Sequence, residues 1–98
     1  MVHLYIDRER ISEFCRRHHI KRLACFGSVL RDDFTLESDV DVLVEFEEGH
    51  TPGLAFFAME RELSEILGRR VDLNTPAFLS REIRAEAARE AEVLYDAA

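Results

Sequence analysis

One segment of this 98-residue chain, the eight residues 39–46 with the sequence Asp-Val-Asp-Val-Leu-Val-Glu-Phe, constrains its fold more than any other. Acidic and apolar residues alternate there with a period of two, which is the repeat of a β-strand and not of a helix. The three valines therefore share one face, which we expect to lie on the core. Asp39 and Asp41 share the opposite face. The chain must contain a sheet with one buried face and another that presents carboxylates.

Apolar spacing predicts the elements around this strand. Helices are indicated by apolar residues three and four apart, and strands by short apolar runs between turn residues. In chain order we expect a helix at 7–18, a strand at 20–26, a helical turn and loop at 28–38, the strand at 40–46, a helix from Thr51-Pro52 to about Gly68, a strand at 71–74 and a helix at 80–95. This order predicts an α/β (α+β) fold, with a small mixed β-sheet, helices packed mainly on one face, and the acidic face open to a ligand.

Composition limits the class of protein. We expect one domain, residues 1–98, with enough apolar residues (47%) to bury a core. The 13 basic and 20 acidic residues give a net charge of −7, which makes nucleic acid unlikely as a direct partner and favours metal ions or a basic partner protein. Cys15 and Cys25 lie in apolar segments, as buried thiols of a cytoplasmic protein do. The first residues are too short an apolar run for a signal peptide or a membrane span.

The end of the first predicted strand, Phe26-Gly27-Ser28, has the form of an anion-binding turn. Gly27 lets the backbone come close to a phosphate, because it carries no side chain. Ser28 offers a hydroxyl and a backbone N–H at the start of a helical turn, where the dipole favours an anion. Arg31, three residues further on, lies on the same side of that turn and can donate to phosphate oxygens. These residues predict a cradle for a nucleoside triphosphate.

The aspartates predict a magnesium site beside this cradle. Asp39 and Asp41 project together from one strand, and Asp72 offers a third carboxylate from another strand. Magnesium prefers hard oxygen ligands and keeps some of its waters, so two or three carboxylates suffice. Two Mg²⁺ ions about 3.5–4 Å apart can stabilise both the attacking and the leaving oxygens of a phosphoryl substitution.

Simpler interpretations of the same residues remain open. An Asp-x-Asp pair is often the solvated face of an edge strand. Asp72 follows two arginines and could pair with Arg69 or Arg70. Arg31 could form a surface ion pair worth less than about 1 kcal/mol. The coincidence of the turn, the spacing and the strand aspartates favours the ligand-binding interpretation.

Taken together, Gly27-Ser28-x-x-Arg31, the run from Ser38 to Val44 and the later strand aspartate resemble the DNA polymerase β-type nucleotidyltransferase superfamily. Within it, the chain is most similar to the minimal nucleotidyltransferases, many of which are antitoxins encoded beside a HEPN-domain toxin. The resemblance covers nearly the whole chain and implies the polymerase β-like nucleotidyltransferase fold. It implies these roles: Gly27 and Ser28 hold the triphosphate, Arg31 contacts phosphate, Asp39 and Asp41 bind the metal, and Asp72 is the third carboxylate, which helps to activate the attacking hydroxyl.

The function that the resemblance implies is Mg-dependent transfer of AMP from ATP to a tyrosine of a HEPN toxin. Larger relatives hold the acceptor with an additional domain, for which this chain leaves no room, so we expect the acceptor to be a partner protein. Two alternatives stay open: an antitoxin that acts by steric binding with little catalysis, and transfer to a small molecule such as an aminoglycoside. The sequence does not decide between a monomer and a homo-oligomer.

Overall fold

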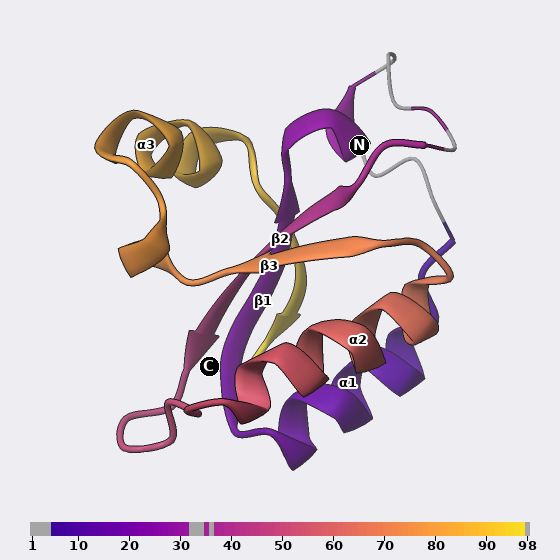
Figure 1. Cartoon of the computed structure of the whole chain (residues 1–98), viewed down its shortest axis with the longest axis vertical. Coiled ribbons are helices and arrows are strands. Elements are labelled where there is room, and N and C mark those ends of the chain that lie inside the picture. The colour runs from indigo at the N-terminus through magenta and orange to yellow at the C-terminus, as the bar shows by residue number, and fades with distance from the viewer. Residues whose placement is uncertain (1–4, 32–34, 36, 98) are drawn as a thin grey trace.

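Figure 1 shows the computed structural model of the chain, which describes residues 5–31, 35 and 37–97. Three α-helices and two short 3₁₀ helices surround four strands. In chain order the elements are α1 (Arg8–Arg17), β1 (Ile20–Phe26), η1 (Gly27–Leu30), β2 (Val40–Phe46), α2 (Ala55–Leu67), β3 (Val71–Asn74), η2 (Pro76–Phe78), α3 (Arg81–Glu90) and β4 (Glu92–Asp96). The predicted fold class, an α/β fold built on a small mixed sheet, is confirmed.

The four strands form one sheet in the order β3-β2-β1-β4. β1 pairs antiparallel with both β2 and β4, whereas β2 pairs parallel with β3. The parallel pair is possible because α2 connects the end of β2 to the start of β3, as a crossover helix does. The valines of β2 are fully buried, as its alternation predicts. The acidic face of the same strand therefore points away from this core.

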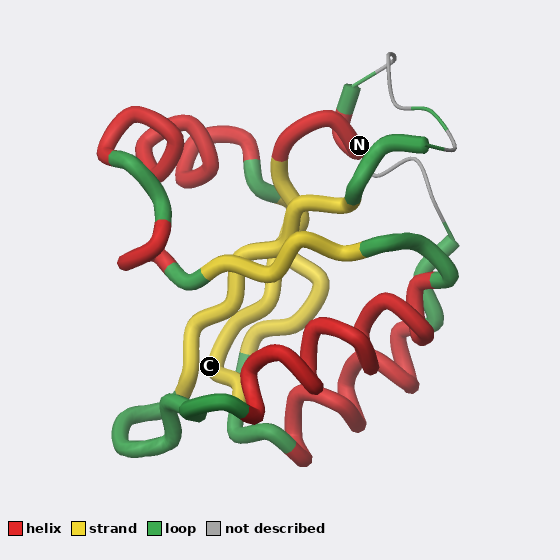
Figure 2. The backbone as a smooth tube through the Cα atoms, in the orientation of Figure 1, coloured by secondary structure: helices red, strands yellow, loops and turns green. Residues whose placement is uncertain are grey.

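The core face of the sheet is covered by α1 and α2, which lie side by side (Figure 2). Asp7 caps α1, because its side chain accepts a hydrogen bond from the backbone N–H of Arg10. Both cysteines are free and buried, and burial raises the pKa of each thiol to about 12. They are therefore packing residues, because a thiol with so high a pKa carries almost no nucleophilic thiolate at neutral pH.

The predicted start of the second long helix, at Thr51-Pro52, is wrong. α2 begins at Ala55, its N-cap is Leu54, and no side chain caps it. Gly53 accounts for the difference, because glycine disfavours a helical backbone by about 1 kcal/mol relative to alanine. The predicted end is confirmed, since Gly68 adopts the left-handed conformation there (φ 67°).

The predicted last helix, 80–95, is also wrong in its second half. Ser80 caps α3 as expected, but the helix ends at Glu90, and Glu92–Asp96 forms the edge strand β4 beside β1. Leu94 is buried in either interpretation, so its spacing could not distinguish them. β-branched and aromatic residues favour a strand, and the free edge of β1 supplies its hydrogen bonds. Tertiary pairing thus overrides the helical spacing.

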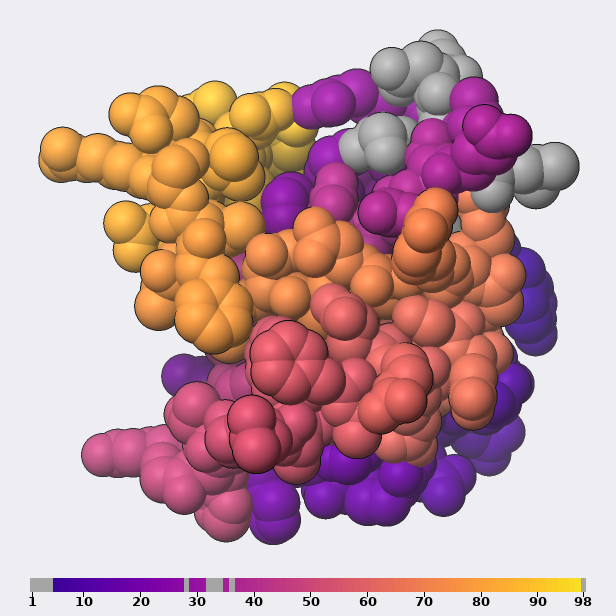
Figure 3. Space-filling view, in the orientation of Figure 1, coloured from indigo at the N-terminus to yellow at the C-terminus, as the bar shows by residue number. Residues whose placement is uncertain are grey.

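α3 lies over the acidic face of the sheet, opposite α1 and α2. In the space-filling view, η2 and α3 form the orange-to-yellow lobe at one corner of the molecule (Figure 3). Only Ala87 of this helix is fully buried, and the apolar side chain of Ile83 is 46% exposed. The helices are thus mainly on one face, as predicted, while the third one partly covers the face that was expected to be open. None of the helices in the described part of the chain is long and apolar enough to cross a membrane.

Candidate active site

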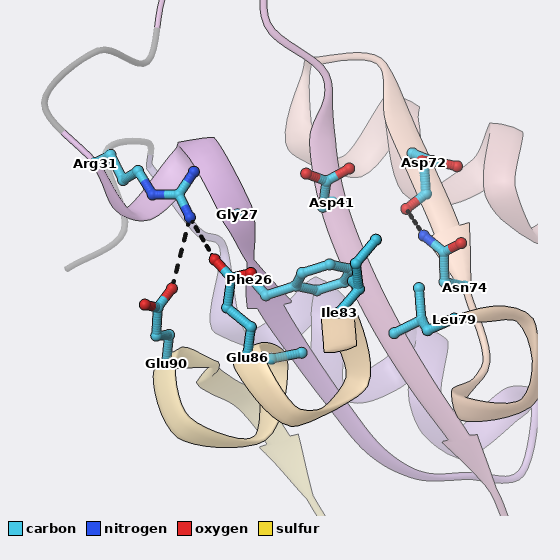
Figure 4. A pocket seen from close by; sticks show the side chains of 11 residues that line it. Phe26, Gly27, Arg31, Asp41, Asp72, Asn74, Leu79, Ile83, Glu86 and Glu90 are labelled. Carbon is cyan, nitrogen blue, oxygen red and sulfur yellow. Dashed lines mark hydrogen bonds and ion pairs between the residues drawn. The ribbon is translucent and has the colours of Figure 1, made fainter. Parts of the chain in front are cut away.

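Two of the predicted site residues lie side by side because β2 and β3 are parallel. The register of this pair aligns Val40 with Val71 and Asp41 with Asp72. Aligned residues of a parallel pair point to the same face, so both carboxylates project toward the side on which α3 lies (Figure 4). The sheet therefore brings together two carboxylates that are 31 positions apart in the sequence.

The Asp41 carboxyl group lies in an environment that disfavours its charged form. It is partly buried, and burial together with the charges of Asp72 and Asp39 raises its pKa to about 6, while Arg31 acts in the opposite direction. A group whose charged form is disfavoured by neighbouring negative charges is one that a cation would stabilise. The electrostatics of this position therefore fit a cation site.

Gly27 lies directly against Asp41, on the edge of β2 that faces β1 and not β3. β1 pairs with β2 so that Phe26 is aligned with Asp41, and Gly27 follows with a positive φ of 77°. A Cβ on Gly27 would collide with Oδ2 of Asp41 and lie 3.3 Å from its Cγ. Both the backbone conformation and the space therefore require glycine here. Ser28 continues into η1, and its side chain lies outside what the structure describes.

These residues line a cavity of about 370 Å³ between the sheet and α3. The sheet contributes Phe26, Asp41, Asp72 and Asn74, Gly27 comes from the start of η1, and Arg31 follows its end. The opposite wall comes from η2 and α3, through Leu79, Ile83, Glu86, Ala87 and Glu90. Each wall therefore contributes two carboxylates beside apolar side chains, and Arg31 contributes a positive charge to the lining.

Arg31 spans the mouth of the cavity, from the end of η1 to α3. Its Nη2 donates to Oε1 of Glu86 at 2.8 Å and lies 3.7 Å from Oε2 of Glu90 (Figure 4). Arg31 therefore forms a surface ion pair, which was one of its two interpretations, and its partners are residues that the local sequence does not suggest. The same guanidinium lines the cavity in which a phosphate is expected, so the two interpretations are compatible.

Asp39 stands apart from the other two aspartates. It precedes β2, its side chain is about half exposed (49%), and its Oδ1 accepts a hydrogen bond from Nε of Arg70 at 2.7 Å. The backbone N–H of Val40 donates to the carbonyl of Arg70 at 2.9 Å, which holds the two segments together. Arg70, one of the two arginines expected as alternative partners for Asp72, therefore pairs with Asp39.

The three aspartates do not form a closed set of metal ligands by themselves. In the described part of the chain, a three-residue group with all ligand atoms within 4.8 Å of one another occurs elsewhere, at His19, Glu47 and His50. Magnesium, however, is commonly held by one or two carboxylates together with substrate phosphates and water. The paired Asp41 and Asp72, with Asp39 close enough to affect the pKa of Asp41, fit that mode of binding.

Sequence reasoning missed several residues of the cavity. Asn74 follows Asp72 by two positions on the same face of β3, and its amide donates to the backbone carbonyl of Asp72 at 3.1 Å. Its spacing could have identified it. Glu86 and Glu90 of α3 could not have been found in this way, because nothing in the local pattern shows which face of the sheet this helix covers.

Comparison with known proteins agrees with this geometry. The family model of a nucleotidyltransferase domain matches residues 8–94. The protein adenylyltransferase MntA of Thermococcus cleftensis is 38% identical over 79 residues, which cover 80% of this chain and 78% of that protein. A proposed protein adenylyltransferase of Methanocaldococcus jannaschii is 48% identical over 58 residues, and the match covers 58% of this chain and 57% of that relative.

Solved structures agree as well. One described as a minimal nucleotidyltransferase is 39% identical, with a TM-score of 0.71, and the match covers 87% of this chain and 86% of that one. A toxin–antitoxin crystal structure with AMP-PNP gives a TM-score of 0.74 at 18% identity, covering 93% of this chain and 74% of that one, which supports the fold alone. The chain belongs to the nucleotidyltransferase domain family, and the resemblance inferred from its motifs is confirmed.

Proposed function

We propose that this protein transfers AMP from ATP to a hydroxyl group of a partner protein, in a magnesium-dependent reaction. The observation that carries the proposal is the alignment of Asp41 with Asp72 beside Gly27, at the wall of a cavity that also contains Arg31. A triphosphate site needs backbone that can approach the phosphates closely, a cationic side chain that contacts them and carboxylates that bind the metal. All three occur around this one cavity.

The nature of the acceptor is supported by the relatives. MntA of Thermococcus cleftensis is named a protein adenylyltransferase. A chain of similar fold (TM-score 0.65, 18% identity) occurs in a structure described as a tri-AMPylated HEPN toxin of Shewanella oneidensis in complex with an MNT antitoxin. We propose a tyrosine of a HEPN-type toxin as the acceptor, with this chain as the antitoxin. The exposed position of Asp72 supports an acceptor that approaches from outside.

The cavity residues have distinct roles in this proposal. Gly27 and the backbone of Ser28 face the triphosphate, and Arg31 donates to its oxygens after leaving Glu86. Asp39, Asp41 and Asp72 would hold magnesium, which when bound supplies charge neutralisation to the phosphates. The acceptor oxygen bonds to the α-phosphorus, the bond between the α- and β-phosphates breaks, and pyrophosphate leaves. Asp72, the most exposed aspartate of the cavity, is positioned to take the proton of the acceptor hydroxyl.

The test is intact-mass measurement of a partner. We would incubate the protein with Mg-ATP and a HEPN-type protein encoded beside its gene, and expect the partner to gain mass in steps of one AMP. Asp41→Asn/Asp72→Asn should abolish the gain, whereas Glu48→Gln, an exposed change far from the cavity, should not. If none of the four nucleoside triphosphates changed the mass of the partner, adenylylation would be excluded.

The same variants separate catalysis from steric inhibition. If transfer silences the toxin, Asp41→Asn/Asp72→Asn should still bind the partner but should no longer relieve its toxicity in cells. Full relief by this variant would instead assign the antitoxin effect to binding alone.

A further inference from the structure

A second cluster of ligand-type side chains lies at the opposite end of the sheet from the cavity. It consists of His19, between α1 and β1, and of Glu47 and His50, in the loop between β2 and α2. Figure 1 shows this loop and the α1–β1 turn at the end of the sheet where β1 begins and β2 ends. Glu47 follows Asp41 by six positions along β2 and its end, a span of roughly 20 Å. The cluster is therefore independent of the nucleotide cavity. We propose that it binds a transition-metal ion, with zinc as the best match.

The donor atoms are already gathered. One ligand atom from each of the three side chains lies within 4.8 Å of the other two, and Nδ1 of His19 lies 3.5 Å from Oε1 of Glu47. The rings of His19 and His50 are stacked, with centroids 3.9 Å apart and an angle of 17° between their planes. Ligand atoms around a zinc ion with bonds of about 2.1 Å lie roughly 3.5 Å apart. One of the three pairs is already at that spacing, and the donor atoms of the others lie within 4.8 Å of one another.

Backbone hydrogen bonds fix the positions from which these three side chains extend. The N–H of Glu47 donates to the carbonyl of His19 at 2.9 Å, and the N–H of His50 donates to the carbonyl of Glu47 at 3.0 Å. His19 is also the non-glycine residue in the described part of the chain with a positive φ, 55°. This conformation is uncommon for residues other than glycine, although histidine adopts it more readily than most, and it turns the chain sharply between α1 and β1. The three Cα positions are thus held together before any ion binds.

The ligand set determines the class of metal. Two imidazoles and one carboxylate suit zinc and similar transition metals, whereas magnesium prefers oxygen ligands alone. Three protein ligands with a fourth position left for water are also a common zinc arrangement. A surface ion pair between Glu47 and one histidine would not require the second imidazole. The presence of both imidazoles within 4.8 Å of one carboxylate oxygen therefore points to a metal ion.

A bound ion would connect two segments that are far apart in the sequence. It would join the α1–β1 turn to the β2–α2 loop, and so restrain the helices of the core face against the sheet. Because the ion would bind the folded chain, it should raise the melting temperature.

The experiment is zinc titration by calorimetry of the metal-free protein, together with cobalt absorption as a report of imidazole ligation. The wild-type chain and Asp41→Asn/Asp72→Asn should each bind one zinc ion and gain thermal stability. His50→Ala, in an exposed loop, and His19→Asn, which tolerates positive φ, should weaken binding at least about ten-fold. His18→Gln is the matched control, since this neighbouring histidine instead contacts Glu62 at 3.0 Å.

The outcomes separate this site from the nucleotide cavity. Zinc binding that survives the loss of Asp41 and Asp72 but not of His50 supports the proposal, whether or not the chain transfers AMP. Zinc binding that is unchanged in His50→Ala and His19→Asn, or lost only in Asp41→Asn/Asp72→Asn, overturns it. The absence of saturable binding to the wild-type chain overturns it as well.

Discussion

Asp41 combines the two properties that a metal-binding carboxylate needs, since it is partly buried and has negatively charged neighbours. In the metal-free protein these features disfavour its ionised form and raise its pKa from 3.8 to about 6. The folded state therefore holds this proton more tightly than the unfolded state does. The ionised carboxylate destabilises the fold above about pH 6, and this effect disappears as the pH falls toward 3.8.

Asp41→Asn should therefore stabilise the metal-free protein at pH 8 and give much less stabilisation at pH 4.5. We expect a gain of about 1 kcal/mol in the free energy of unfolding at pH 8, a value reduced for solvent screening because the side chain is partly exposed. Urea unfolding in the presence of a chelator at both pH values measures this. Glu48→Gln, which alters an exposed carboxylate, is the control. An equal effect of Asp41→Asn at the two pH values would contradict the prediction.

Gly27 makes a second prediction at the scale of one residue. Gly27→Ala adds a left-handed backbone cost of about 1–2 kcal/mol and a collision with the Asp41 carboxylate. Gly68→Ala is the matched control, because Gly68 has a similar φ of 67° and nothing within 4 Å of an added Cβ. Chemical denaturation should show a larger loss for Gly27→Ala than for Gly68→Ala.

The activities of these two variants should differ more than their stabilities. Displacing a catalytic group by about 1 Å can cost roughly 100-fold in rate. Nucleotidyl transfer should therefore fall about 100-fold in Gly27→Ala and stay near the wild-type rate in Gly68→Ala. Similar rates in the two variants would show that Asp41 is not displaced.

At the scale of elements, α3 matters because it completes the cavity and engages Arg31. Two of its glutamates, Glu86 and Glu90, bind the guanidinium that we expect to contact phosphate. Nucleotide binding must therefore replace these contacts. α3 therefore forms a wall of the cavity and also competes with the nucleotide for Arg31.

Glu86→Gln/Glu90→Gln should accordingly strengthen nucleotide binding. Because an exposed ion pair is worth about 0.2–1 kcal/mol, we expect a two- to five-fold lower Kd for a non-hydrolysable ATP analogue, measured by calorimetry with magnesium present. Arg31→Ala should weaken binding about ten-fold, because it removes a charge-assisted hydrogen bond. Glu82→Gln, on the same helix but outside the cavity lining, should change neither. Unchanged affinity in Arg31→Ala would remove Arg31 from the site.

The elements also show how far the sequence could predict this structure. The strand 40–46 was predicted with its correct bounds, because period-two alternation over seven residues has no helical counterpart. Leu94 satisfies both a helical and a strand interpretation, so β4 depended on the unpaired edge of β1, which a local pattern does not contain. The same limit applies to the site. The alternation predicted that Asp41 and Asp72 face away from the core, but their alignment depends on the register of two distant strands.

At the scale of the whole molecule, the carboxylates and the cradle are built from separate segments that only the folded chain brings together. A ligand that binds this arrangement binds the native state alone and must stabilise it. Saturating Mg-ATP should raise the melting temperature by roughly 10 °C at about 100 times its Kd. Asp41→Asn/Asp72→Asn should lose most of this increase. A wild-type melting temperature that does not respond to Mg-ATP would count against an intact site.

The parallel pairing of β2 with β3 has a consequence for how the protein becomes active. Hairpin contacts between β1 and β2 close a short loop, but β3 can dock only after the chain has passed through the whole of α2. Contacts of greater sequence separation form later and more slowly. The aligned carboxylates are therefore expected to form after the pairing of β1 with β2. A partly folded chain in which only β1 and β2 have paired lacks the aligned carboxylates. Enzymatic activity is therefore expected only once β3 has also paired with β2.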